Sequence, residues 1–272
     1  MTSNLFLRTI SSVVLFPLVV MAVWFGHSVN EDYGVPLFSL LLAVFGTGLA
    51  WEWEKMISKK TSFVSLWTAL AVGISSFIGG SNPTVALWSI LIITGIVCFK
   101  SNISLAFGVL YICLPLLSLE YIYYLSDGGF SREPVLWLFF IVWATDIGGY
   151  IVGKTVQGPK LAPRISPSKT WSGLCGAVVF SMGMAYLFYL FFRDYLENIS
   201  ETSLVISAGV LAVISQIGDL FESYIKRRLG LKDSSNLLPG HGGLFDRVDG
   251  LLFASMALAA VMYANNQGWI FS

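Results

Sequence analysis

Nine apolar stretches divide this chain, and each is long enough, or nearly long enough, to cross a lipid bilayer as a helix. A membrane-spanning helix needs roughly 20 predominantly apolar residues. The stretches are residues 10–25, 35–53, 63–78, 84–99, 105–125, 135–152, 171–192, 204–221 and 251–265. The sequence therefore predicts an all-α integral membrane protein. We expect one polytopic domain over residues 1–272, with spans one to five in residues 1–125 and spans six to nine in residues 126–272.

The placement of Lys and Arg predicts the orientation, because positively charged loops stay on the cytoplasmic side of a membrane. Of the 16 basic residues, 14 fall on one side of the nine predicted spans, and only Arg132 and Arg193 fall on the other. This asymmetry favours a cytoplasmic N-terminus, a non-cytoplasmic C-terminus and a multi-pass location in the cell (inner) membrane. The first stretch follows Arg8 but lacks a small-x-small cleavage motif, so we expect a retained helix and not a signal peptide.

The overall composition excludes some classes of function. Hydrophobic residues make up 56% of the chain and charged residues only 12%, outside the usual balance of a soluble domain. Acidic and basic residues are equal in number, at 16 each, which gives no indication of a nucleic-acid partner. The cysteines, Cys98, Cys113 and Cys175, lie in apolar stretches and form no CxxC pair, so we interpret them as small hydrophobic residues.

The acids Asp146 and Asp219 lie within predicted spans. An ionisable group at membrane depth costs about 2.5 to 3.5 kcal/mol, so it usually faces a cavity and has a partner. Asp219, Ser223 and Lys226 recur at i, i+4 and i+7, which predicts that they share one helical face. The alternative is a structural carboxylate bonded to a neighbouring helix.

Glycines follow Asp146 at i+3 and i+7, as Gly149 and Gly153. That face is bare backbone, so either another helix or a ligand can approach it closely.

Two polar loops, residues 153–170 and 222–250, are both expected on the cytoplasmic face. The first supplies cations and hydroxyls before a span: Lys160, Arg164, Ser166, Lys169 and Thr170. Attraction to anionic lipid headgroups would explain its charge, but not the prolines and serines between the charges.

The second loop ends in "KDSSNLLPGHGGLFDRVDG", residues 232–250. Gly240, Gly242 and Gly243 allow tight turns and close approach to phosphate. Asp246 and Asp249 are one helical turn apart, and carboxylates of this kind hold Mg²⁺ through one or two oxygens while phosphates and water supply the rest. An Asp before an apolar run is also a good helix N-cap, but a cap needs only one acid. The loops together predict one pocket at the cytoplasmic membrane boundary for a polyphosphate and a phosphorylated lipid.

Residues 223–249 resemble the signature of the phosphatidate cytidylyltransferase (CDP-diacylglycerol synthase) family. The shared positions are Ser223, Lys226, Arg227, Lys232, Asp233, His241, Gly242, Gly243, Asp246, Arg247 and Asp249. A second block, beginning at Asp146, is similar to the family's "SPxKTWEG" region through Ser166, Pro167, Lys169, Thr170 and Trp171. Ser172 stands where the family commonly carries glutamate.

The resemblance implies a Mg²⁺-dependent reaction in which CTP and phosphatidate give CDP-diacylglycerol and pyrophosphate. It also implies a helical, dimeric protein among membrane lipids. We expect Asp219 and Asp246 to bind the metal, while Asp146 and Asp249 orient them or hold a second cation. The catalytic set would be Asp146, Asp219, Ser223, Lys226, Asp246, Arg247 and Asp249.

Substrate binding would fall to Ser166, Lys169, Thr170, Arg227, Lys232, Asp233, His241, Gly242 and Gly243. We expect the cations of Lys226 and Arg247 to face the surface.

Two other functions stay open. A related CTP-using lipid kinase would phosphorylate a polyprenol or similar alcohol by attack at the γ-phosphorus. A transporter would use Asp146 and Asp219 as ion or proton sites, but it has no obvious use for the glycine and histidine loop.

Overall fold

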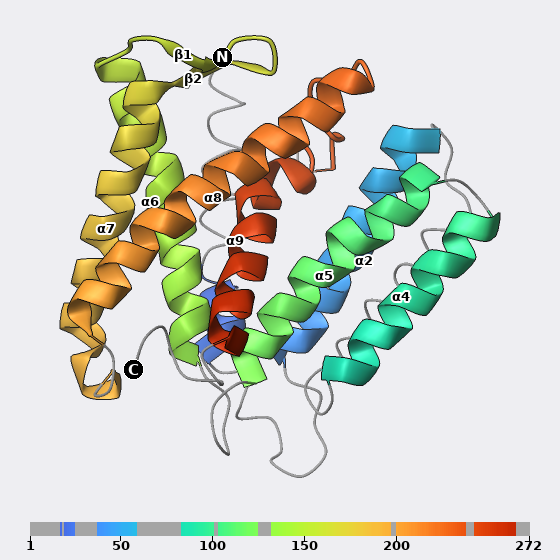
Figure 1. Ribbon diagram of the computed structural model, residues 1–272, viewed down its shortest axis with the longest axis horizontal. Helices are drawn as coiled ribbons and strands as arrows, with labels where there is room; N and C mark the ends of the chain where they lie inside the picture. Colours follow the sequence, from blue (N-terminus) through green and yellow to red (C-terminus); the bar gives the residue numbers. More distant parts are fainter. Residues whose placement is uncertain are drawn as a thin grey trace. The chain divides into compact units, whose positions relative to one another are not determined.

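The computed structural model describes residues 17, 19–24, 37–58, 83–100, 103–124, 132–196, 200–237 and 242–264. Helices make up most of this part of the chain (Figure 1). They are α2 (Leu37–Ser58), α4 (Pro83–Lys100), α5 (Ile103–Tyr124), α6 (Arg132–Thr155), α7 (Trp171–Phe192), α8 (Glu201–Arg228) and α9 (Phe245–Ala264). Strands β1 (Lys160–Ala162) and β2 (Ser166–Thr170) precede α7, and the short 3-10 helix η1 (Arg193–Tyr195) follows it.

The predicted spans and the observed helices largely coincide. Each of the predicted spans at 35–53, 84–99, 105–125, 135–152, 171–192, 204–221 and 251–265 is found as a helix. Residues 19–24 of the first span are helical as well, whereas the span predicted at 63–78 lies outside the described residues. In the part of the chain that the structure describes, 5 helices can cross a membrane by length and composition: α5, α6, α7, α8 and α9. The chain is therefore a mostly helical multi-pass membrane protein.

Two helix ends differ from the predicted span ends. Helix α8 continues to Arg228, beyond the predicted end at Phe221, and α9 begins at Phe245, before the predicted start at Leu251. The apolar pattern marks the part of a helix that lipid can cover, whereas backbone hydrogen bonds continue into the polar flanks. Both extensions carry candidate site residues, which therefore lie on helices and not in loops.

The chain divides into two compact units. The first joins Met1–Tyr124 to Arg228–Val248, and the second joins Leu125–Arg227 to Asp249–Ser272. That the two units form one polytopic domain stays a prediction.

In the first unit, aromatic rings join the start of α9 to α2 and α5. The Trp53 ring centroid lies 5.6 Å from that of Tyr111 and 5.9 Å from that of Phe245, and Tyr111 stacks on Phe245 at 5.8 Å. Phe245 is fully buried. Trp53 Nε1 also donates a hydrogen bond of 3.0 Å to the carbonyl oxygen of Ser104. The cluster fixes where α9 begins within this unit.

In the second unit, α6 packs closely on α7 through glycines. A Cβ at Gly153 would lie 3.3 Å from the Cα of Gly173 and 3.2 Å from Thr170 Oγ1. A Cβ at Gly149 would lie 3.7 Å from the carbonyl oxygen of Gly173. Of the two alternatives for the bare face after Asp146, the structure therefore shows contact with another helix.

A β-hairpin joins α6 to α7. Strands β1 and β2 pair antiparallel, with Lys160 opposite Thr170 and Ala162 opposite Ser166. Thr170 Oγ1 accepts a hydrogen bond of 3.1 Å from the Gly173 N–H, so Thr170 is the N-cap of α7. The first polar loop is thus an ordered hairpin that runs directly into a membrane-spanning helix.

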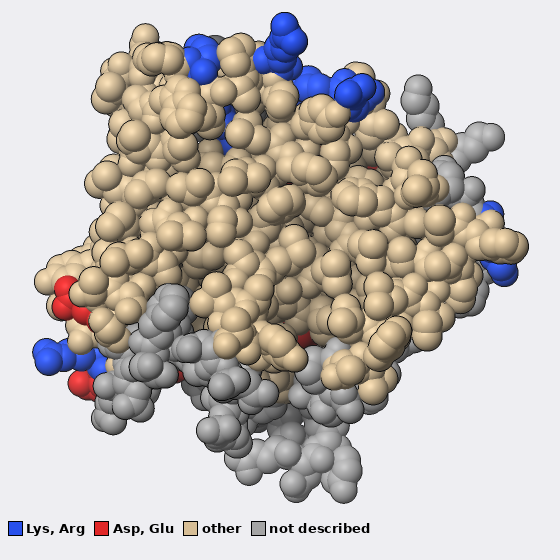
Figure 2. Space-filling model, in the orientation of Figure 1, with Lys and Arg blue, Asp and Glu red and all other residues tan. Residues whose placement is uncertain are grey.

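Exposed cations gather at the hairpin end of the second unit. Figure 2 shows Lys and Arg side chains at the end where the hairpin lies. The exposed cations of that end include Lys154, Lys160 and Arg164. At the opposite end of α7, the exposed Arg193 is accompanied by the exposed acid Asp194.

Candidate active site

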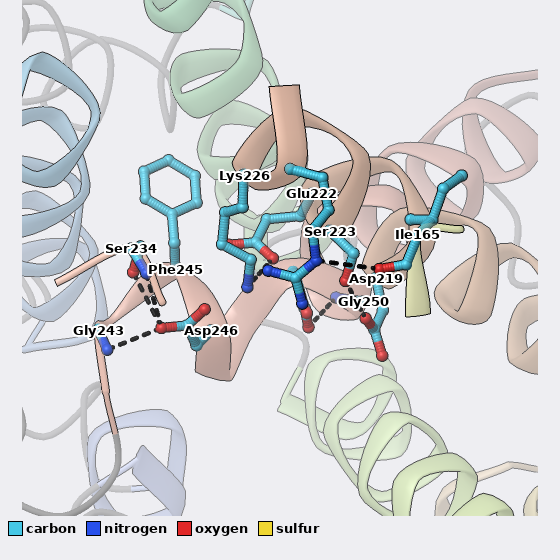
Figure 3. A network of polar contacts seen from close by, with 12 residues as sticks. Ile165, Asp219, Glu222, Ser223, Lys226, Ser234, Gly243, Phe245, Asp246 and Gly250 are labelled. Atoms are coloured by element: carbon cyan, nitrogen blue, oxygen red, sulfur yellow. Dashed lines mark hydrogen bonds and ion pairs between the residues drawn. The ribbon is translucent and has the colours of Figure 1, made fainter. Parts of the chain in front are cut away.

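Asp219 has a cationic partner in the second unit. Its Oδ2 atom lies 2.5 Å from Lys169 Nζ on strand β2. Its Oδ1 atom accepts a hydrogen bond of 3.4 Å from Ser223 Oγ, one turn further along α8 (Figure 3). The Lys169 side chain is 15% exposed and that of Asp219 is 28% exposed. A carboxylate in an apolar helix usually has a partner, and Lys169 is the partner of Asp219.

Further acids lie near Asp219. Asp249, in α9, lies close enough to Asp219, Glu222 and Asp146 for their charges to act on it. Its Oδ1 atom accepts a hydrogen bond of 2.7 Å from the Gly250 N–H. Three acids predicted from separate stretches of sequence are therefore neighbours, and Asp146 is exposed to solvent or lipid.

Glu222 is a site residue that the sequence analysis missed. Its Oε2 atom lies 2.5 Å from Lys226 Nζ, one turn further along α8, and the two side chains are only 3% and 9% exposed (Figure 3). The i, i+4 spacing of a glutamate and a lysine was the available signal. The expectation that Lys226 faces the surface is wrong, because Glu222 neutralises it in a buried position. Arg247 is exposed, as expected.

Asp246 belongs to the first unit, where it binds the loop that precedes α9. Its Oδ2 atom accepts hydrogen bonds from the Gly243 N–H at 2.8 Å, the Ser234 N–H at 3.0 Å and Ser234 Oγ at 3.1 Å (Figure 3). An N-cap side chain accepts from amides of its own helix. These donors precede α9, so the cap alternative does not describe them.

The glycine loop is tight, as predicted. Gly242 has a φ of +83°, in the left-handed region that favours glycine. A Cβ at Gly243 would lie 1.8 Å from Ser234 Oγ, so a larger residue does not fit there without a shift of the loop. Lys232 and Asp233 are exposed in the same unit. His241 and Gly240 lie outside the described residues.

Several hairpin residues have structural partners. Arg227 Nε donates a hydrogen bond of 3.3 Å to the carbonyl oxygen of Ile165, which ties α8 to the hairpin (Figure 3). Ser172, at the position where glutamate is common, shares a hydrogen bond of 3.0 Å with Thr170 and donates another to the Gln157 carbonyl oxygen. Ser166 is half-buried at the start of β2.

The acids of the second unit have the type of donor atom that suits Mg²⁺. Mg²⁺ prefers hard oxygen donors and often takes only one or two carboxylates, with phosphates and water completing its shell. Among the residues that the structure describes, no group of three or more His, Cys, Asp or Glu is arranged to hold a metal ion. Sharing of one metal by Asp219 and Asp246 stays a prediction, because the two acids belong to different units.

These features define a polytopic membrane protein with carboxylates and cations on its helices. The chain belongs to the cytidylyltransferase family, whose model matches residues 6–265. It is 36% identical over 271 residues to the phosphatidate cytidylyltransferase of Brucella suis, covering 96% of this chain and 93% of that protein. It is 31% identical over 260 residues to the phosphatidate cytidylyltransferase of Rickettsia conorii, covering 94% of this chain and 90% of that protein. The family resemblance is confirmed, and it extends over the N-terminal helices as well as the motifs.

Proposed function

We propose that this chain is a phosphatidate cytidylyltransferase. It transfers CMP from CTP to phosphatidate and gives CDP-diacylglycerol and pyrophosphate, a step of phospholipid biosynthesis. The observation that carries the proposal is the 36% identity, over 96% of the chain, to a relative with this name. The acids and cations of the second unit are the side chains that such a reaction between two phosphates requires.

The reaction is an in-line displacement at the α-phosphorus of CTP. A phosphate oxygen of phosphatidate forms a bond to that phosphorus, the bond to the β-phosphate oxygen breaks, and pyrophosphate leaves. Transfer of this kind requires mainly positioning and charge neutralisation from the protein. Because a phosphate monoester is already anionic near neutral pH, no residue has to act as a general base.

The cations that hold the phosphates come from the hairpin, α8, the loop before α9 and the first turn of α9. In this proposal Lys169 and Lys226, each paired with an acid, exchange that partner for substrate phosphate, while Arg227, Lys232 and Arg247 are exposed and accessible. Ser166, Ser223 and Thr170 supply hydroxyl donors, and His241, Gly242 and Gly243 complete the loop. Asp233 stays a candidate through the family resemblance.

The acids would hold Mg²⁺, with Asp219 and Asp246 as its ligands and Asp146 and Asp249 as orienting groups or as holders of a second cation. When held there, the ion would supply positive charge that offsets the negative charge of the phosphates. Within the second unit, Asp219 and Asp249 are neighbours on α8 and α9, so both acids can act at the same bound substrate.

The membrane arrangement in this proposal has nine spans, a cytoplasmic N-terminus and the site on the cytoplasmic face of the cell (inner) membrane. The exposed cations at the hairpin end of the second unit support it, because that end would be cytoplasmic by the positive-inside rule. Two copies of the chain form the active protein, with CTP arriving from water and phosphatidate from the surrounding lipid.

Pyrophosphate release tests the proposal. Protein purified in detergent should release pyrophosphate from CTP only when phosphatidate and Mg²⁺ are both present. An Asp219→Asn protein purified in the same way controls for contaminating host enzyme. No release by the unsubstituted protein would contradict the proposal. If the protein releases no pyrophosphate but moves ions or protons across vesicle membranes, the result would favour the transporter.

A further inference from the structure

Glu52 is a buried acid near the end of α2, in the part of the chain that precedes all the motifs. Its side chain is fully buried, with 0% of the residue exposed. Both carboxylate oxygens nevertheless have donors: Oε1 accepts from the Leu244 N–H at 2.8 Å, and Oε2 accepts from the Phe245 N–H at 2.8 Å. These donors are 192 and 193 residues away in the sequence.

The two amides lie where α9 begins. The first N–H groups of a helix have no partner within the helix, so another group has to accept from them. A carboxylate is the preferred acceptor there, because the helix dipole places positive charge at this end. Glu52 therefore caps α9 from a different helix, and its neighbour Trp53 packs on the Phe245 ring at the same point.

Glu52 also holds the loop that binds Asp246. Ser235 Oγ donates to Glu52 Oε1, and Ser234 Oγ lies 3.2 Å from Glu52 Oε2 and 3.1 Å from Asp246 Oδ2. A hydroxyl has one proton, so Ser234 bridges the two acids and donates fully to one at a time. Gly243 fits between them, since a Cβ there would lie 2.7 Å from Glu52 Oε1.

We propose that Glu52 is a positioning residue for the transfer reaction: it fixes the start of α9 and the Ser234–Ser235 loop, and thereby holds the Asp246 carboxylate in one place. The proposal rests on the proposed function. Glu52 itself is buried among donors of its own unit and acts through Asp246. Loss of one partner from such a shared network leaves the remaining donors without an acceptor.

The direct test is Glu52→Gln. Glutamine has nearly the same size but only one acceptor oxygen, so its NH₂ group would face an amide or hydroxyl donor. We expect kcat to fall roughly 10- to 100-fold, the usual cost of losing an outer partner of a functional acid. The KM values for CTP and phosphatidate should change little, because no substrate-binding cation is altered. An unchanged kcat would overturn the proposal.

The matched control is Glu54→Gln on the same helix. Glu54 is also buried, at 1% exposed, but two residues along a helix it points to a different side. We expect its kcat to stay near that of the unsubstituted protein. An equal loss in both variants would show a general need for acids in α2, which would contradict a specific role for Glu52.

Hydrogen–deuterium exchange tests the positioning role of Glu52 independently of enzyme activity. In Glu52→Gln, amides of residues 243–246 should exchange faster, whereas those in α7 should not change. If Glu52→Gln does not fold, Glu52→Asp keeps both acceptors and the charge, and should show a smaller change in the same amides. Unchanged exchange in the variant tested would overturn the proposal.

These outcomes distinguish the positioning role of Glu52 from the proposed function. Faster exchange at residues 243–246 supports the capping role even if the unsubstituted protein does not convert CTP, a result that would contradict only the proposed function. Active unsubstituted protein with fully active Glu52→Gln would contradict only the positioning role.

Discussion

Lys169 Nζ lies 2.5 Å from Asp219 Oδ2, which joins the hairpin before α7 to the middle of α8. The Lys169 ammonium neutralises the Asp219 carboxylate, and it can bind a substrate phosphate in the same way, because carboxylate and phosphate both present anionic oxygens. The pair therefore joins strand β2, in the block that begins at Asp146, to helix α8 within the second unit.

Lys169→Gln should lower kcat/KM for the transfer reaction. A charge-assisted hydrogen bond to phosphate contributes about 1.5 to 3 kcal/mol, and its loss corresponds to roughly 10- to 150-fold in rate. Lys160→Gln is the matched control, because Lys160 is exposed on the other strand of the same hairpin. Steady-state kinetics with both substrates would check this, and equal effects of the two substitutions would contradict a specific role for Lys169.

Asp246→Asn should abolish transfer while the protein still folds. Asparagine keeps an acceptor oxygen for the Gly243 and Ser234 amides, but it is a poor Mg²⁺ ligand and removes the charge. We expect the loss to exceed the roughly 10- to 100-fold typical of an outer partner. Raised Mg²⁺ should restore activity only partly. Full turnover at ordinary Mg²⁺ would show that Asp246 only organises the loop.

Lys226→Met should reduce stability as well as activity, because it leaves Glu222 as a buried acid without its lysine. Breaking a buried ion pair from one side costs about 3 to 5 kcal/mol. The double substitution Glu222→Gln with Lys226→Met should recover much of the stability but not the activity. Thermal unfolding in detergent, measured beside Arg247→Ala as an exposed control, would check this. A Lys226→Met protein as stable as Arg247→Ala would refute the buried pair.

The helices were predictable because lipid demands long apolar runs, and those runs gave the positions of α2 and α4 to α9. The ends of α8 and α9 were not, since polar residues such as Lys226 and Asp246 continue a helix by backbone hydrogen bonds that hydropathy does not measure. Spacing along one helix predicted that Ser223 would meet Asp219, and their side chains share a hydrogen bond.

Contacts between distant segments were beyond the sequence pattern. Nothing in the spacing relates Glu52 to Phe245, which is 193 residues away. The rule that singled out Asp146 and Asp219, an acid inside an apolar run, also applies to Glu52 and Glu120, and both are fully buried. The signal was therefore present, but partners could be assigned only from the structure.

The orientation predicts opposite accessibility for two exposed positions of the second unit. In a protein without its native cysteines, a cysteine at Lys160 (K160C) should react with an impermeant thiol reagent only from the cytoplasmic side. A cysteine at Asp194 (D194C), beyond the other end of α7, should react only from the opposite side. Labelling of both from one side would refute the proposed orientation.

The most direct test of the transfer reaction is to follow each phosphate of CTP. Purified protein with phosphatidate and Mg²⁺ receives CTP labelled at the α-phosphate in one reaction and at the γ-phosphate in another. We predict that the α-label enters the lipid fraction as CDP-diacylglycerol, while the γ-label appears in pyrophosphate. Transfer of the γ-label to a lipid, with CDP released, would contradict the account and identify a lipid kinase.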